Sequence, residues 1–207
     1  MINYIVCLKW GNKYGPEYVN TLEQMVRRYC TLPFEFVCFT ENPQGLNSTV
    51  RVMPIAQGYG VSGWWHKPLL FNPCLPLGDP QGTVLYIDLD VIVFRSIDNL
   101  LTYKPNEFCV IRDFIQNPAA PVRRFHGDQD WLYAQVKNDF NFWPDEWIQS
   151  YKWEMRGKPP MVRNQDGTKD FISPGVPKIH PQTSIAVFHG DPQPKHCQDP
   201  WCKENWK

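Results

Sequence analysis

The first half of the chain alternates between short apolar runs and segments of helical periodicity, and this alternation limits the possible fold more than any other feature. Strands are predicted where apolar and β-branched residues run together, at 3–8, 34–40, 50–55, 83–87 and 91–94. Apolar residues recur at helical spacing from Pro16 to Tyr29, and a second helix is predicted from Trp64 to Phe71. Parallel neighbouring strands need such crossovers. The pattern therefore predicts an α/β domain with a mixed, mostly parallel sheet.

The second half carries a weaker pattern. The regular pattern weakens after 108–112. A helix is predicted from Gly127-Asp128 to about Lys137, and a last strand over Ser184–Phe188. The 207 residues suit one domain with a substantial core, and no repeat of domain scale is present. We therefore expect a single domain spanning residues 1–207.

Charge and hydropathy exclude some classes of partner. The chain has 21 basic and 21 acidic side chains, so it has no strong basic field for nucleic acid or an anionic membrane. The apolar run Tyr4–Leu8 is too short for a signal peptide, and no run reaches transmembrane length, so we expect a cytoplasmic protein. Among the seven cysteines, Cys197 and Cys202 are expected to be reduced surface thiols, with a zinc site as the alternative.

Two aspartates, Asp88 and Asp90, follow the predicted buried strand 83–87. In an extended chain, residues i and i+2 point to the same side, so the two carboxylates should lie together. Close like charges are unfavourable unless a cation joins them, and Mg²⁺ or Mn²⁺ held by few carboxylates keeps positions open for phosphate oxygens. The carboxyl ends of this strand and of the first strand should open onto one crevice, where open α/β sheets bind ligands. A metal-binding pair is therefore predicted, the alternative being a simple strand-terminal turn.

The segment Val84–Phe94 resembles the Asp-x-Asp motif of nucleotide-sugar glycosyltransferases with the GT-A fold, and the chain is similar to glycosyltransferase family 8 in particular. Four further segments occur in the family's order. They are the loop after the first strand (Leu8, Lys9, Trp10 and Tyr14), Trp65-His66-Lys67, Gly127-Asp128-Gln129-Asp130, and Phe188-His189-Gly190 with Lys195. The ordered set covers nearly the whole chain and is much more specific than Asp-x-Asp alone.

The resemblance implies roles for these residues. Asp88, Asp90 and His189 would bind Mn²⁺ or Mg²⁺. Leu8, Lys9, Trp10, Tyr14, Lys67, Asp88 and Lys195 would contact the nucleotide or its diphosphate. Asp128 would hold sugar hydroxyls, Gln129 would lie beneath the reacting carbon, and Asp130 would orient both. Because Phe-His-Gly-Asp occurs at 125–128 and again at 188–191, His126 is an alternative ligand; His189 is preferred because Lys195 follows six residues later.

The implied activity is transfer of a sugar from a nucleotide-diphosphate donor, by family default a UDP-sugar, to a glycan or other small acceptor, with retention of configuration. Residues 1–100 would form the nucleotide-binding half. Residues 101–207 would form the sugar and acceptor half, ending in the metal-ligand tail. The family's longer segment with an Asn-Ser pair has no counterpart between Arg112 and Gly127.

Two alternatives come from other classes of protein. A haloacid-dehalogenase-like phosphatase would use Asp88 as nucleophile and Asp90 as acid/base group beside Mg²⁺. About 80 residues of strand–helix pattern precede Asp88, whereas that motif normally opens its domain. The other alternative is a catalytically idle domain that binds a sugar nucleotide or glycan, suggested by the missing Asn-Ser segment and by the many aromatic residues.

Overall fold

Four parallel strands form the N-terminal sheet of the computed structural model. They are β1 (Asn3–Lys9), β2 (Phe34–Thr40), β3 (Arg51–Met53) and β4 (Val84–Tyr86), in the spatial order β3-β2-β1-β4. In the register, Val6 lies opposite Val37 on one side and Tyr86 on the other. The structure describes residues 2–55, 63–71, 75–79, 81–111, 132, 136, 139–156, 161–163, 169–171 and 178–207.

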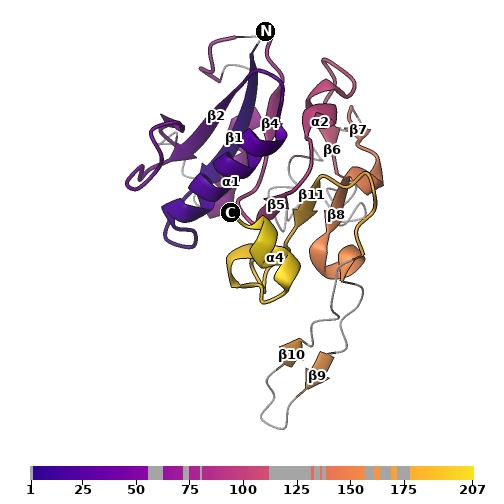
Figure 1. Cartoon of the computed structure of the whole chain (residues 1–207). Helices are drawn as coiled ribbons and strands as arrows, with labels where there is room; N and C mark the ends of the chain where they lie inside the picture. Colours follow the sequence, from indigo (N-terminus) through magenta and orange to yellow (C-terminus); the bar gives the residue numbers. More distant parts are fainter. Residues whose placement is uncertain are drawn as a thin grey trace, which may run out of the picture.

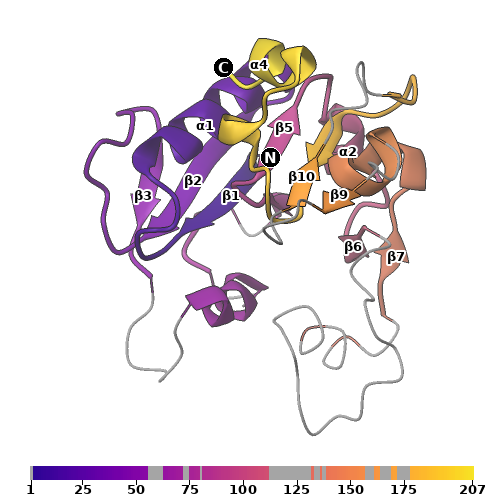
Figure 2. The same cartoon turned by 90° about the horizontal axis from the view of Figure 1, so that it is seen from below.

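The longest helix, α1 (Pro16–Tyr29), connects β1 to β2 and covers one face of this sheet (Figures 1 and 2). Proline stands in its first turn with Glu17, and Arg27 and Arg28 stand in its last, which matches the polarity of the helix dipole. Its inner face packs on strand residues in a core that includes Leu22, Met25, Val26, Ile5, Cys7 and Phe36. This burial holds the start of α1 beside the end of β1.

The opposite face of the sheet is covered by a 3-10 helix, η1 (Gly63–Phe71), and by the segment 75–79 (Figure 2). Strand residues alternate between the faces, so Tyr4, Val6 and Leu8 pack on this side with Leu70 and Leu77. Pro68 lies inside η1 and supplies no backbone N–H, so the segment predicted as a helix from Trp64 to Phe71 is present in a tighter form. The arrangement fixes Lys67 on the side of the sheet away from α1.

A second sheet has the order β5-β11-β8, with β5 (Val91–Val93), β11 (Ile185–Val187) and β8 (Ile148–Ser150). Strand β11 runs antiparallel to β5 and parallel to β8. Its core is continuous with the layer between α1 and the first sheet, because Ile92, Ile185 and Phe188 belong to the same buried cluster as Leu22. The pairing brings the end of the chain back to the segment that follows β4.

Shorter elements complete the described structure. They are α2 (Asp98–Thr102), β6 (Cys109–Val110), β7 (Asn141–Phe142), η3 (Asp145–Trp147), the π-helical turn η4 (Tyr151–Met155), β9 (Met161–Arg163), β10 (Lys169–Phe171), η5 (Pro194–His196) and α4 (Pro200–Asn205). Strands β6 and β7 pair in parallel, and β9 and β10 pair antiparallel. No helix among the described residues is long and apolar enough to cross a membrane.

Most of the strands predicted from the sequence are present in the structure. The strands predicted at 3–8 and 34–40 are present at their full length, and those predicted at 50–55, 83–87, 91–94 and 184–188 are present but shorter. The predicted helix from Gly127 to Lys137 lies outside the described residues, except that Leu132 and Val136 are helical. The prediction that Cys197 and Cys202 are surface thiols is wrong: these residues are 3% and 0% exposed, because both belong to the core cluster that also contains Tyr151 of η4.

Candidate functional site

The candidate site lies where the strand order of the first sheet reverses. The chain adds β2 and β3 on one side of β1 and then returns to place β4 on the other side. The Ile87 amide donates to the Val6 carbonyl at 2.9 Å, so the parallel ladder continues one residue beyond β4. Asp88 then leaves the sheet at the level of Leu8. Ligands of open α/β sheets bind at such a switch point, outside the carboxyl ends of the strands.

Asp88 has two close partners on the side of the sheet away from α1. Its Oδ1 lies 2.8 Å from Lys67 Nζ, and the Tyr86 hydroxyl donates to the same oxygen at 2.7 Å. The Asp88 side chain is 39% exposed, against 20% for Lys67, so the pair lies at the surface of the crevice. Lys67 Nζ also lies 5.7 Å from the centroid of the Tyr86 ring. Lys67, predicted to contact a diphosphate, is therefore held at the predicted metal ligand by η1.

Asp90 faces the loop between β1 and α1. The Tyr14 hydroxyl donates to Asp90 Oδ2 at 3.1 Å. Burial raises the pKa of Asp90, the nearby charge of Asp88 raises it further, and the hydrogen bond from Tyr14 opposes both effects. Burial also raises the pKa of Tyr14, with Asp90 the next cause, so its hydroxyl stays protonated and remains a donor. The two carboxylates thus influence each other electrostatically but are held by different elements.

His189 reaches the same edge through the pairing of β11 with β5. Val187 lies opposite Val91, and the Phe188 amide donates to the Asp90 carbonyl at 2.9 Å. His189 follows directly, and its carbonyl accepts a 2.7 Å hydrogen bond from Lys152 Nζ. In the described part of the chain, the ligand atoms of Asp88, Asp90 and His189 do not all lie within 4.8 Å of one another. The backbone therefore brings the three predicted ligands to one edge without gathering their side chains into a closed cluster.

The loop after β1 contributes side chains of different exposure. Leu8 is buried, and its side chain belongs to the core beneath the sheet. Lys9 is only 4% exposed, and its Nζ lies 3.5 Å from the Asn42 carbonyl. Trp10 packs on the same core and approaches Gly63, where an added Cβ would lie 3.5 Å from the indole ring. Gly63 also has φ +66°, so glycine there permits the turn into η1.

Lys195 lies at the start of α1 instead of at the acid pair. Its Nζ lies 2.5 Å from Glu17 Oε1, and both side chains are nearly half exposed. The Tyr18 hydroxyl donates to Gln193 Oε1 at 2.7 Å, which fastens the tail beside Lys195. The Tyr18 ring packs edge-on against Tyr14, with ring centroids 4.8 Å apart. Two tyrosines of one segment therefore connect Asp90 with the tail that carries Lys195.

The predicted catalytic residues Asp128, Gln129 and Asp130 lie outside the described residues, as does the alternative ligand His126. Sequence reasoning assigned no role to Tyr86, Glu17 or Lys152, each of which contacts a predicted site residue. Tyr86 could have been noticed, because it precedes Asp88 by two residues and so shares its side of the extended chain. The contacts of Glu17 and Lys152 cross the chain by 178 and 37 residues, and no local pattern signals them.

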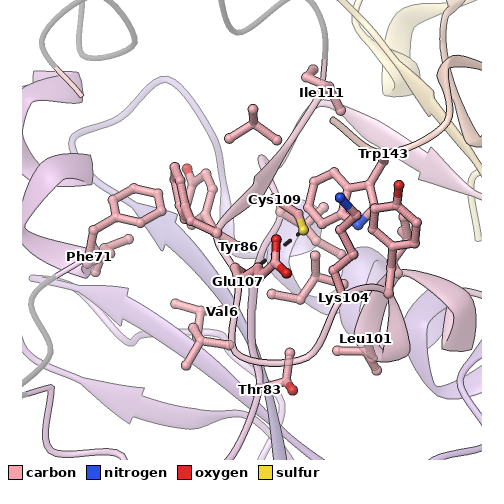
Figure 3. Close-up of a pocket in the computed structure, with 18 of the residues that line it drawn as sticks. Val6, Phe71, Thr83, Tyr86, Leu101, Lys104, Glu107, Cys109, Ile111 and Trp143 are labelled. Atoms are coloured by element: carbon pink, nitrogen blue, oxygen red, sulfur yellow. Dashed lines mark hydrogen bonds between the residues drawn. The ribbon is translucent and has the colours of Figure 1, made fainter. Parts of the chain in front are cut away.

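A largely apolar cavity of about 540 Å³ borders Asp88 and Lys67 on the outer side of β4. Figure 3 shows Phe71 and Tyr86 on one side of it and Lys104 and Trp143 on the other. The wall beyond β4 comes from the segment 103–111, which includes β6. Asp88 and Lys67 therefore have space for a ligand beside them.

The chemistry of the acidic pair fits a hard divalent cation. Asp88 and Asp90 supply carboxylate oxygens, the donors that Mg²⁺ and Mn²⁺ prefer. Burial, and next the nearby charge of Asp88, raise the pKa of Asp90, and a cation between the two carboxylates would offset their repulsion. Among the described residues, no group of three close ligand atoms includes this pair, which leaves coordination positions for oxygens of a bound ligand.

Known structures with a similar fold are glycosyltransferases. One is an active-site mutant of LgtC, in which glutamate replaces a glutamine, with a TM-score of 0.62 and 13% identity over 97% of this chain and 93% of that one. Another is galactosyltransferase LgtC in complex with donor and acceptor sugar analogues, with a TM-score of 0.60, 13% identity and the same coverage. A third is the apo form of GlyE from Streptococcus pneumoniae, with a TM-score of 0.60 and 11% identity over 100% of this chain and 59% of that chain.

These likenesses establish the fold, which is the GT-A fold that the sequence predicted. The sequence itself matches no family model and no curated protein. At 11–13% sequence identity, these likenesses are evidence for the fold alone. The comparisons do not favour the phosphatase alternative, because these neighbours are all glycosyltransferases.

Proposed function

We propose that this chain is a metal-dependent glycosyltransferase similar to family 8, which moves a sugar from a nucleotide-diphosphate donor, a UDP-sugar, to a glycan or other small acceptor. The observation that carries the proposal is the position of Asp88 and Asp90 at the switch point of a GT-A sheet, with Lys67 2.8 Å from Asp88. Two carboxylates that can bind a cation and a lysine that can bind a phosphate lie together at this point. A nucleotide diphosphate with its cation requires this pattern of charges.

Asp88 and Asp90 would hold Mn²⁺ or Mg²⁺, with His189 as the further ligand; the pairing of β11 with β5, just before His189, supports this choice. The bound cation would act as a Lewis acid toward the diphosphate leaving group. Lys67 pairs with Asp88 in the free protein, so it is already desolvated in part and can exchange that carboxylate for a phosphate oxygen. Lys195 would supply a second positive charge after leaving Glu17. Both lysines would stabilise the charge that develops on the departing diphosphate.

The loop after β1 would form the nucleotide pocket. Tyr14 is fixed by Asp90, and Trp10 is fixed against Gly63, so their rings are positioned before a ligand arrives. Such pre-organised aromatic side chains suit a nucleobase. Lys9 and Leu8 would support this loop from beneath, since both are buried. Under this assignment, about residues 1–100 form the nucleotide-binding half and about 101–207 the acceptor half.

In the reaction, the bond between the anomeric carbon and the diphosphate oxygen breaks, and a bond to an acceptor hydroxyl oxygen forms. The nucleoside diphosphate leaves with the bonding electron pair, and the proton of the acceptor hydroxyl passes to the departing diphosphate or to solvent. Asp128, Gln129 and Asp130 would contact the donor sugar, with Gln129 beneath the reacting carbon and configuration retained. An active-site glutamine was the residue changed in one LgtC structure, which supports a glutamine in this role. A cytoplasmic location stays a prediction from the sequence.

The test is turnover with a panel of nucleotide sugars in the presence and absence of Mn²⁺. A glycosyltransferase hydrolyses or transfers from one of them in a metal-dependent way and leaves phosphomonoesters intact. Asp90→Ala should abolish metal-dependent donor binding while the circular dichroism spectrum stays native. Hydrolysis of phosphomonoesters with a phosphate trapped on Asp88 would overturn the proposal in favour of a phosphatase. Binding of a nucleotide sugar without any turnover would reduce it to a binding domain.

A further inference from the structure

The C-terminal tail contains a buried cluster of side chains that the proposed function does not use. Cys197 Sγ, a carboxylate oxygen of Asp199 and Cys202 Sγ all lie within 4.8 Å of one another. The three residues are 3%, 3% and 0% exposed. Within the part of the chain that the structure describes, this is the only group of three or more potential His, Cys, Asp or Glu ligands gathered so closely.

Local structure and packing hold this cluster in place. Cys197 follows η5, and the Cys202 amide donates to the Asp199 carbonyl at 3.0 Å, closing the turn into α4. The Tyr151 ring stacks on Trp201 with ring centroids 5.9 Å apart, and the Cys197 thiol donates to the Tyr151 hydroxyl oxygen at 3.6 Å. Residues five apart in sequence are thus brought together by an ordered turn under an aromatic cover.

A buried positive charge lies beside the cluster. Arg156 Nε is 3.6 Å from Asp199 Oδ2, and the side chains of both are only 3% exposed. The Arg156 guanidinium also lies over the Tyr151 ring, 5.4 Å from its centroid. Buried ions are costly unless their charges are balanced. With both thiols protonated, Arg156 and Asp199 balance each other.

We propose that Cys197, Asp199 and Cys202 bind Zn²⁺, a thiophilic divalent cation. Binding would replace the two thiol protons by the metal, and both protons would leave to solvent. Two thiolates and one carboxylate then carry three negative charges, which the cation and Arg156 balance, so the net charge of the buried cluster does not change. The cluster can therefore exchange protons for a metal without leaving an uncompensated charge in the core.

The spacing of the ligand atoms is close to what zinc requires. Tetrahedral zinc has Zn–S bonds of about 2.3 Å and Zn–O bonds of about 2.0 Å, which places its ligand atoms about 3.3–3.8 Å apart. The three ligand atoms already lie within 4.8 Å of one another, so small changes in the side-chain torsion angles would bring them to that spacing. The Tyr151 hydroxyl, which accepts from the Cys197 thiol in the free protein, would turn to donate to the thiolate.

The site would have a structural role that does not depend on the proposed function. It would fasten the tail that contains η5 and α4 onto η4, through Arg156 and Tyr151. Lys195 lies two residues before Cys197, so the same clamp would set the position of the lysine that pairs with Glu17. Zinc bound only by the folded tail adds its binding energy to folding.

The experiment measures zinc content and zinc-dependent stability of the full chain purified under reducing conditions. We expect inductively coupled plasma mass spectrometry to find about one zinc ion per chain. After removal with a chelator, added Zn²⁺ should raise the melting temperature, and Co²⁺ should give the thiolate charge-transfer band in the near ultraviolet. Because two protons leave on binding, the zinc affinity should fall by up to about a hundredfold for each unit by which the pH is lowered. This slope applies in the pH range where both thiols of the metal-free protein are protonated.

Variants assign the effect to these residues. Cys197→Ser with Cys202→Ser, and separately Asp199→Asn, should lose the zinc and the cobalt band. Cys109→Ser, which changes a less buried cysteine outside the cluster, should keep both. If the variants do not fold, the stripped wild-type chain still decides the question. Failure of Zn²⁺ to bind or stabilise it, a cobalt spectrum unchanged in the variants, or a Cys197–Cys202 disulfide in the purified protein would overturn the proposal. None of these results bears on nucleotide-sugar turnover.

Discussion

The Tyr14 hydroxyl donates a 3.1 Å hydrogen bond to Asp90 Oδ2, joining residues that are 76 positions apart. One end of this bond belongs to the loop that follows the first strand, and the other to the acidic pair that follows the fourth. The bond therefore couples the proposed nucleotide pocket to the proposed metal ligands. It also keeps the Asp90 carboxylate oriented and partly offsets its loss of hydration.

Tyr14→Phe removes this hydrogen bond and leaves the ring in place. We expect a loss of about 0.5–1.5 kcal/mol in the free energy of unfolding. The pKa of Asp90 should rise further, because the bond from Tyr14 lowers it in the native protein. Protons then compete with the metal at higher pH, so Mn²⁺-dependent UDP binding should fail at a higher pH than in the wild type. Calorimetric titrations across a pH series test this, and an unchanged midpoint would contradict it.

Asp90→Asn and Asp98→Asn should have opposite effects on stability. Burial raises the pKa of Asp90, so above its unfolded pKa the charged carboxylate costs stability, and the cost disappears as pH falls through the raised value. Burial also acts to raise the pKa of Asp98, but hydrogen bonds from Thr31, at 2.6 and 2.9 Å, outweigh it and lower that pKa. Asp98 therefore stabilises the protein above its unfolded pKa, and this contribution is lost at low pH.

The measurement is the melting temperature of both variants from neutral pH down to acid pH. At neutral pH, Asp90→Asn should melt at or above the wild-type temperature, while Asp98→Asn should melt roughly 2–4 °C lower for each kcal/mol lost. Both differences should shrink as the solution becomes acidic. The prediction is contradicted if Asp90→Asn lowers the melting temperature at neutral pH and this loss fades at low pH. That result would mean that the surroundings of Asp90 do not disfavour its charged form.

The succession of strands and helices and the acid pair could be predicted from sequence because both follow from local patterns. Continuous apolar runs define β1 and β2, and the two-residue spacing of Asp88 and Asp90 is read directly. The resemblance placed Lys67 and Tyr14 at the site, but their direct contacts with the two carboxylates could not be predicted, because these contacts join segments that are far apart in the chain. The burial of Cys197 and Cys202 was also missed, because a tail rich in proline has no periodicity, and tertiary contacts with Tyr151 decide its position.

Lys67→Met should weaken binding of the nucleotide diphosphate in the presence of Mn²⁺. One charge-assisted hydrogen bond contributes about 1.5–3 kcal/mol, so we expect a dissociation constant about 10- to 100-fold higher. Methionine keeps the apolar stem that lies near Tyr86. Lys178→Met removes the same charge from an exposed position and serves as the control. Equal effects of the two changes on UDP affinity would remove Lys67 from the site.

Lys195→Ala and Glu17→Gln separate stability from binding in the tail. The Lys195–Glu17 pair is nearly half exposed, so breaking it should cost less than about 1 kcal/mol in unfolding free energy. Lys195→Ala should nevertheless weaken donor binding, whereas Glu17→Gln frees the ammonium and should leave binding unchanged or stronger. Thermal melts and UDP titrations of the two variants are compared. If both variants weaken donor binding equally, the salt bridge itself is needed, and Lys195 does not contact the ligand.

The most direct test of the proposed site is the effect of Mn²⁺ on UDP binding to the wild type and to the Asp88→Asn, Asp90→Asn double variant, followed by isothermal titration calorimetry. The substitutions keep the side-chain shape and remove both charges, and a native circular dichroism spectrum confirms the fold of the variant. Mn²⁺ should strengthen UDP binding to the wild type and have no effect on the variant. An equal gain from Mn²⁺ in both proteins would contradict the assignment of Asp88 and Asp90 as the metal ligands.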